Sequence, residues 1–221
     1  VGTVNGLVRY DGYSAMVYPE FSVPDNVLVL LCDSLGRLWA GKYASSLSLY
    51  DPAKDRFVHF KGKRDATLSF HPSYTQTMYE DPSGIIWIGT EDAIVSLDLG
   101  NARNEVSADS VVRHARFRTT PCNGFKGGSL KLERWDDSSL IVATVGGLFI
   151  VNRHTRAISR PGLPPIRELE LDTLPAATLL RESPTKLWIG TYTHGLYVFD
   201  QSSGSLTGYH RKPSEGKSDS G

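Results

Sequence analysis

The stretch Leu187-Trp188-Ile189-Gly190-Thr191 is repeated along this chain. It recurs as Ile86-Trp87-Ile88-Gly89-Thr90 and, with a different last residue, as Leu38-Trp39-Ala40-Gly41-Lys42. A degenerate copy reads Leu140-Ile141-Val142-Ala143-Thr144, and the chain opens on part of a fifth copy, Val1-Gly2-Thr3. Because a fixed period is the signature of repeat architectures, these copies decide the fold before any other feature does.

The spacing of the copies matches one blade of a β-propeller. Trp39 and Trp87 are 48 residues apart, Trp87 and Ile141 are 54 apart, and Ile141 and Trp188 are 47 apart. Four short strands with their turns fill that length, and no convincing amphipathic helix interrupts them. The sequence therefore predicts an all-β fold, a β-propeller built of four-stranded antiparallel blades.

The repeats also predict the blade ranges. We expect a propeller segment over 1–210, with a partial blade at 1–18 and full blades at 27–60, 75–118, 129–160 and 176–210, then a polar tail at 211–221. Within the blade expected at 75–118, residues 100–109 are expected to form a mobile loop and residues 111–118 an outer strand. Val27–Cys32 is nearly all apolar, which predicts an innermost strand buried on both faces.

The chain opens inside a repeat, and no apolar strand follows His210 to complete the first blade. We therefore expect an incomplete segment, of about four-and-a-half to five blades, of a larger propeller. Open propeller edges expose strand backbone and apolar faces, so in isolation the segment could form a homodimer.

The repeated residues have a structural interpretation. The tryptophans offer a large apolar plate between blades, and their indole N–H groups are expected to reach backbone carbonyls. The glycine two positions later removes a side chain where another blade's backbone approaches. The structural residues are Trp39, Gly41, Trp87, Gly89, Thr90, Trp188, Gly190 and Thr191.

Composition argues against several functions. Lys plus Arg and Asp plus Glu both number 24, and without a basic stripe we expect no nucleic-acid partner. No apolar run approaches the roughly 20 residues that span a bilayer, so membrane attachment would need flanking segments. The six histidines lack zinc spacing, and no nucleophile elbow or phosphate loop occurs, so we expect no metal, cofactor or catalytic residue. Cys32 is expected to be a buried hydrophobe, and a disulfide with Cys122 stays open.

The pattern Asp, two residues, Gly, two residues, Trp, one residue, Gly, Thr is complete in Asp81, Gly84, Trp87, Gly89 and Thr90, and nearly so from Asp33 to Gly41. It resembles the two-component regulator propeller repeat. That resemblance implies a periplasmic propeller of a sensor histidine kinase, notably of the hybrid sensors with which gut bacteria detect polysaccharide breakdown products. Kinase activity and the remaining blades would then lie elsewhere in the full-length protein. The sialidase-type Asp-box is similar, but turn chemistry explains these aspartates better than catalysis does.

Candidate ligand-binding residues occupy the turns between second and third strands, which share one end of a propeller with the connectors between blades. Aromatic rings beside carboxylates suit sugar recognition, although the same residues are common in turns. The candidates are Tyr43, Glu91, Asp92, Tyr192, His194, His71 and Tyr74. The function predicted is a ligand-sensing or interaction segment that responds to a carbohydrate. A propeller enzyme acting on polysaccharide (lyase or glycoside hydrolase) and a protein-interaction scaffold stay open as alternatives.

Overall fold

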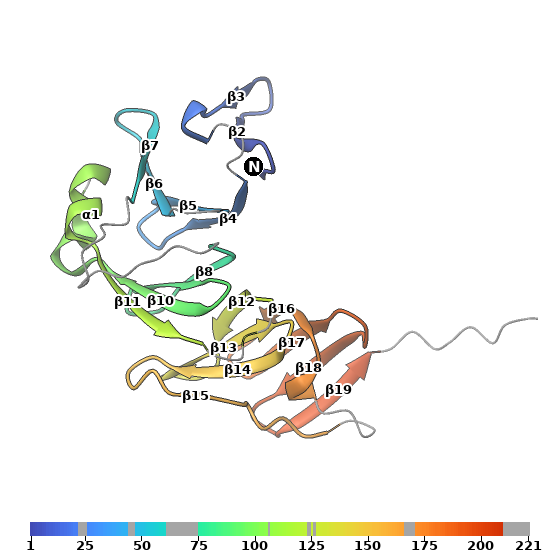
Figure 1. Ribbon diagram of the computed structural model, residues 1–221. Coiled ribbons are helices and arrows are strands. Elements are labelled where there is room, and N and C mark those ends of the chain that lie inside the picture. Colours follow the sequence, from blue (N-terminus) through green and yellow to red (C-terminus); the bar gives the residue numbers. More distant parts are fainter. Residues whose placement is uncertain are drawn as a thin grey trace, which may run out of the picture.

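The protein was analysed as a computed structural model that describes residues 1–21, 26–43, 47–60, 75–105, 107–122, 125, 127–165 and 171–209. These residues form five antiparallel sheets that follow one another around an open arc (Figure 1). One sheet has three strands and four have four, each ordered as a meander. The predicted all-β propeller fold is confirmed. The expected tail at 211–221 lies outside the described residues.

The strands of the sheets follow the repeats in chain order. The first sheet contains β1 (Gly2–Thr3), β2 (Gly6–Tyr10) and β3 (Ala15–Val17), and the 3-10 helix η1 (Pro19–Phe21) follows it. The second contains β4 (Val27–Cys32), β5 (Leu38–Lys42), β6 (Leu47–Asp51) and β7 (Arg56–His59). The third contains β8 (Thr77–Glu80), β9 (Ile86–Gly89), β10 (Ala93–Asp98) and β11 (Arg116–Pro121).

The last two sheets repeat the same plan. The fourth contains β12 (Ser129–Arg134), β13 (Ser139–Thr144), β14 (Gly147–Asn152) and β15 (Ile158–Ser159), followed by the 3-10 helix η3 (Leu171–Thr173). The fifth contains β16 (Ala176–Arg181), β17 (Lys186–Thr191), β18 (Leu196–Asp200) and β19 (Ser205–Tyr209). Strands β4, β12 and β16 each carry a register shift near their first residue, so this irregularity recurs with the repeat.

The hydrophobic core is divided into clusters that lie between neighbouring blades. Trp39 belongs to the cluster that joins the second and third sheets, and Trp87 to the one that joins the third and fourth. Both tryptophans are fully buried. A single meander cannot bury both of its faces, and stacking supplies the missing contacts. The predicted role of these residues as plates between blades agrees with this packing.

Two predictions about the third sheet were wrong. Residues 100–114 include the 3-10 helix η2 (Gly100–Asn104) and the helix α1 (Ala108–His114), where a mobile loop and the start of a strand were expected. The outer strand β11 begins only at Arg116. Helix α1 lies beside the second sheet (Figure 1). It buries Ala108 and Val111 there, and this tertiary packing outweighs the weak local preference of a short segment. No helix among the described residues is long and apolar enough to cross a membrane.

The expectation of a β4 strand buried on both faces was also wrong. Its exposure alternates, and Leu28, Leu30 and Cys32 are exposed. Strands β4, β8, β12 and β16 are the first strands of their sheets, and β4 packs on β8 and β12 on β16 along the inner side of the arc (Figure 1). One face of β4 therefore points to the open interior of the arc. Cys32 and Cys122 are free thiols, and burial raises the pKa of Cys122 to about 11.

Candidate functional site

In the second and third sheets the repeat spacing places a buried aspartate against the indole of the same blade, and we call this pairing the carboxylate latch. Asp81 Oδ1 accepts hydrogen bonds from the backbone N–H of Ser83 and Ile85, and Oδ2 accepts one from Trp87 Nε1 at 2.9 Å. Asp33 holds the preceding blade in the same way, with Trp39 Nε1 donating to Oδ2 at 2.8 Å. The indole partner is thus a carboxylate six residues earlier, and the expected backbone carbonyl was wrong. One buried aspartate thus accepts hydrogen bonds both from the backbone of the turn and from the indole of the tryptophan.

The last blade keeps this arrangement with a longer acid. Trp188 Nε1 donates to Glu182 Oε2 at 2.7 Å, again across six residues. Glu182 was not recognised from the sequence, because 183–185 departs from the turn pattern of the other blades. Trp188 is half-buried and its ring packs on Tyr209, whereas Trp39 and Trp87 are fully covered by the next blade.

Arginines from the following blade extend the latch across the interface. Arg153 Nη1 donates to Asp81 Oδ2 at 2.8 Å, and the Arg156 guanidinium carbon lies 4.3 Å from the centroid of the Trp87 ring. The side chain of Asp81 is 1% exposed, so its charge is balanced almost entirely by protein groups. Asp81 therefore joins its own blade to the next one.

The repeated glycines admit side chains of the next blade. A Cβ atom on Gly41 would lie 2.3 Å from Thr75 Cγ2, and one on Gly89 would lie 2.6 Å from Ser129 Cβ. Gly190, in the last described blade, meets only Thr178 of its own blade. The atoms nearest to these glycines thus belong to side chains, whereas the backbone of another blade was expected from the sequence. In both cases glycine is required because a larger residue would not fit.

Acid should weaken this latch. Burial alone would raise the pKa of Asp81, but hydrogen bonds from Ser83, Trp87 and Arg153 outweigh it and lower the pKa below its ordinary value. A lowered carboxylate pKa stabilises the fold above the unfolded-state value of about 4, and this stability is lost as the pH falls. We expect the urea midpoint to be nearly constant from about pH 7 to pH 5 and to fall below about pH 4. The fall should be shallower in Asp81→Asn, and parallel curves for the two proteins would contradict the assignment.

The turns at the other end of the blades carry the predicted ligand-binding residues. Tyr43 is 43% exposed and Tyr192 is 59% exposed, and Glu91 is also exposed. Asp92 is exposed and accepts a hydrogen bond from Thr90 Oγ1. The backbone N–H of His194 donates to Thr191 Oγ1 at 3.0 Å. His71 and Tyr74 lie outside the described residues.

Backbone hydrogen bonds fix these turns to the connectors between blades. The N–H of Tyr43 donates to the carbonyl of Asn26, and that of Tyr192 donates to the carbonyl of Pro175. The carbonyl of Thr90, beside Glu91, accepts from the N–H of Ser129. The turns therefore lie at the same end of their blades, but on different blades around the arc.

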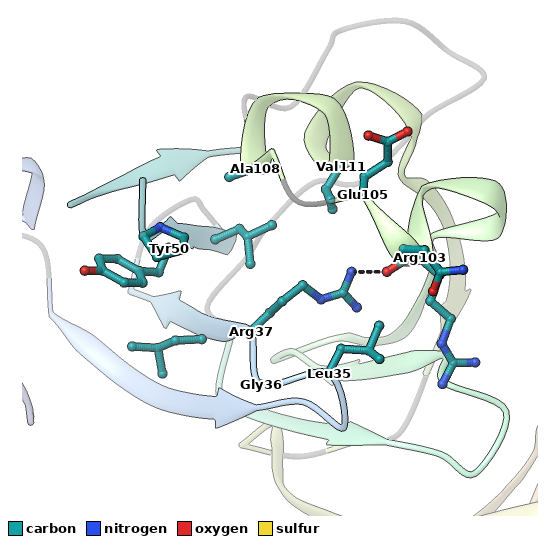
Figure 2. Close-up of a pocket in the computed structure, with 12 residues that line it drawn as sticks. Leu35, Gly36, Arg37, Tyr50, Arg103, Glu105, Ala108 and Val111 are labelled. Carbon is teal, nitrogen blue, oxygen red and sulfur yellow. Dashed lines mark hydrogen bonds between the residues drawn. The ribbon is translucent and has the colours of Figure 1, made fainter. Parts of the chain in front are cut away.

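A pocket lies at the opposite end, between the second sheet and the helical insertion of the third. Its volume is about 440 Å³, and its walls come from the β4–β5 turn, strands β5 and β6, and the segments η2 and α1. Figure 2 shows Arg37 reaching across it toward the carbonyl of Arg103, below Ala108 and Val111. The sequence analysis missed this pocket. The apolar spacing of Ala108, Val111 and Ala115 was the available signal, because it fits one face of a helix.

Within the part of the chain that the structure describes, no group of three or more His, Cys, Asp or Glu side chains is arranged to hold a metal ion. The chemistry available at the turn end is aromatic stacking and hydrogen bonding. Such groups bind polar ligands.

Residues 68–92 match the family model of the two-component regulator propeller, and this stretch includes Asp81, Trp87 and Gly89. The match covers this one repeat of the chain. None of the curated proteins matches the sequence.

Solved structures of similar fold include extracellular and surface proteins of bacteria. The extracellular domain assigned to a hybrid two-component system of B. thetaiotaomicron is 18% identical, with a TM-score of 0.55 over 83% of this chain and 24% of that chain. PorZ, a surface component of the type-IX secretion system of Porphyromonas gingivalis, is 17% identical, with a TM-score of 0.65 over 95% of this chain and 32% of that one. This chain thus spans a quarter to a third of the length of these neighbours.

An enzyme shares the fold as well. Virginiamycin B lyase from Staphylococcus aureus is 10% identical, with a TM-score of 0.62 over 93% of this chain and 63% of that one. At such identities the likeness shows the propeller fold alone, and activity must be argued from the site.

Proposed function

We propose that this chain is the ligand-sensing segment of a periplasmic propeller in a two-component histidine kinase, and that it binds a carbohydrate at the turn end. The observation that carries the proposal is the exposure of Tyr43 and Tyr192 at the positions where the repeats differ, on turns at the same end of the blades as the carboxylates of Glu91 and Asp92. Tyrosine rings stack on the apolar faces of sugar rings, and carboxylates accept hydrogen bonds from hydroxyls. His194, His71 and Tyr74 complete the proposed set.

The remaining blades of the full propeller belong to the same proposal. The outer face of the last described blade carries Leu180 at 64% exposure, with Tyr209, Leu196 and half-buried Trp188. The equivalent tryptophans of inner blades are covered by a neighbour, so we propose that a further blade, or a second copy of the chain, covers this face. Binding at the turns would then change how blades pack and so activate the kinase. No observation favours a lyase or a hydrolase.

Tyr192→Ala tests the proposed sugar site. Binding is measured by calorimetry with cellotetraose, xylotetraose and tetragalacturonate. Because one stacking contact contributes about 0.5–1.5 kcal/mol, we expect the variant to bind the best ligand up to about tenfold more weakly. Tyr13→Ala is the matched control, since Tyr13 is 98% exposed in the β2–β3 turn at the opposite end. Equal affinity of Tyr192→Ala and the unmodified chain would remove Tyr192 from the site.

A further inference from the structure

The pocket beneath the helical insertion is built by a segment that the blade itself does not need. In the other four-stranded sheets, four or five residues join the third strand to the fourth, whereas 17 residues separate Asp98 from Arg116. This insertion buries Ala102, Ala108 and Val111, and it roofs a hollow over β5 and β6. Insertions placed on a rigid scaffold are where binding sites concentrate.

The walls of the pocket are largely apolar. Leu35, Leu38, Leu49, Pro52, Ala108 and Val111 supply aliphatic surface, and Tyr50 supplies a ring whose hydroxyl is already bonded to Asp55 at 2.6 Å. The volume of about 440 Å³ lies within the range of pockets that hold small molecules. An occupant must therefore have a mainly apolar body.

Arg37 supplies the polar end of the pocket. Its Nε donates to Asp33 Oδ2 at 2.7 Å and its Nη1 donates to the carbonyl of Arg103 at 2.9 Å. These contacts fix the guanidinium, whose side chain is only 14% exposed, while Nη2 has no hydrogen-bond partner among the described residues. A fixed donor in an apolar pocket selects a ligand with an acceptor group (Figure 2).

The second basic residue of the pocket is already engaged elsewhere. Arg103 Nη1 donates to the carbonyl of Ser83 at 2.6 Å, and its Nη2 lies 4.0 Å from Glu80 Oε1. Glu105 is exposed at the rim and disfavours a second anionic group. These contacts direct the Arg103 guanidinium toward the third sheet, so the donor considered for an acceptor group in the pocket is Arg37 Nη2.

We propose that this pocket is a second ligand site, separate from the turn end, for a small molecule with an apolar body and a single carboxylate that bonds to Arg37 Nη2. Such a ligand would wedge between the second blade and the insertion of the third. It would thereby stiffen the junction of those two blades.

The test uses two probes with the same apolar body, 4-phenylbutyrate and 4-phenylbutylammonium. Binding to the whole chain is followed by calorimetry and by amide chemical shifts. We expect saturable binding of the carboxylate, with shifts at Leu35, Tyr50 and Val111, and at least tenfold weaker binding of the ammonium, which cannot accept from Arg37. Equal binding of the two probes, or no saturable binding of the carboxylate at millimolar concentration, would overturn the proposal.

Four variants keep the test independent of folding. Arg37→Gln should lower carboxylate affinity at least tenfold, but it also removes a contact of Asp33 and could unfold the turn. Leu35→Ala changes an exposed turn residue of the pocket wall and should lower affinity about threefold to tenfold, whereas Leu196→Ala, on the last blade, should leave it unchanged. Unchanged affinity in a folded Leu35→Ala would contradict the site. Tyr192→Ala should bind 4-phenylbutyrate normally, so that failure here and failure of the sugar site are distinguishable.

Discussion

Asp81→Ala should lower the free energy of unfolding by about 3–5 kcal/mol, the cost of removing one partner of a buried charged pair. The change leaves the indole N–H of Trp87 and the guanidinium of Arg153 without their shared acceptor inside the blade interface. It also removes the acceptor for two backbone N–H groups of the turn. Urea unfolding followed by tryptophan fluorescence measures the effect.

Asp136→Ala is the matched control for this prediction. Asp136 lies in the same turn of the next blade, but its side chain bonds to Ser138 and Ser139 of that turn, and the tryptophan position there is Ile141. We expect a loss of about 1 kcal/mol, as for an ordinary capping side chain. If both variants lose the same stability, Asp81 acts only as a turn residue and the latch across blades does not exist.

Trp87→Ala should have an effect of similar size, about 3–5 kcal/mol. The ring is fully buried between the third and fourth sheets, and Leu132 and Val142 belong to the same cluster, so its removal leaves a cavity at the interface. Trp188→Ala should cost only about 1–2 kcal/mol, because Trp188 is half-buried and no described blade covers it. The same urea unfolding experiment compares the two variants. A larger loss of stability for Trp188→Ala than for Trp87→Ala would contradict the proposed role of Trp87 in packing between two blades.

The sequence was sufficient for the fold because the repeat is a packing unit. The period of the tryptophans and the turns around Asp33 and Asp81 located each meander, and the structure has its strands at those places. Helix α1 was missed because it is short and is stabilised by contacts with β6 and β7, which local sequence does not reveal. The exposed face of β4 was missed because an apolar sequence does not indicate whether a strand is covered by another blade or faces the open interior of the arc.

The candidate binding residues, like the fold, could be predicted from the sequence only in part. The turn residues Tyr43, Glu91 and Tyr192 were found because strand order fixes the end at which each turn lies, although which of them touch a ligand stays a prediction. The pocket around Arg37 could not be found, because its walls come from two blades and an insertion. A carboxylate partner for each of the three tryptophans of the repeat could have been found, since Asp33, Asp81 and Glu182 each precede one of them by six residues.

A double-mutant cycle of Asp81→Asn and Trp87→Phe tests the central claim that the repeat spacing joins a carboxylate to the indole within the blade interface. Phenylalanine keeps the apolar plate but removes the N–H, and asparagine keeps the shape of the acid but removes its charge. Urea unfolding of the four proteins should give a coupling energy of about 1–2 kcal/mol, whereas the exposed pair Glu182 and Trp188 should give less than about 0.5 kcal/mol. Additive losses at Asp81 and Trp87, within about 0.3 kcal/mol, would contradict the account.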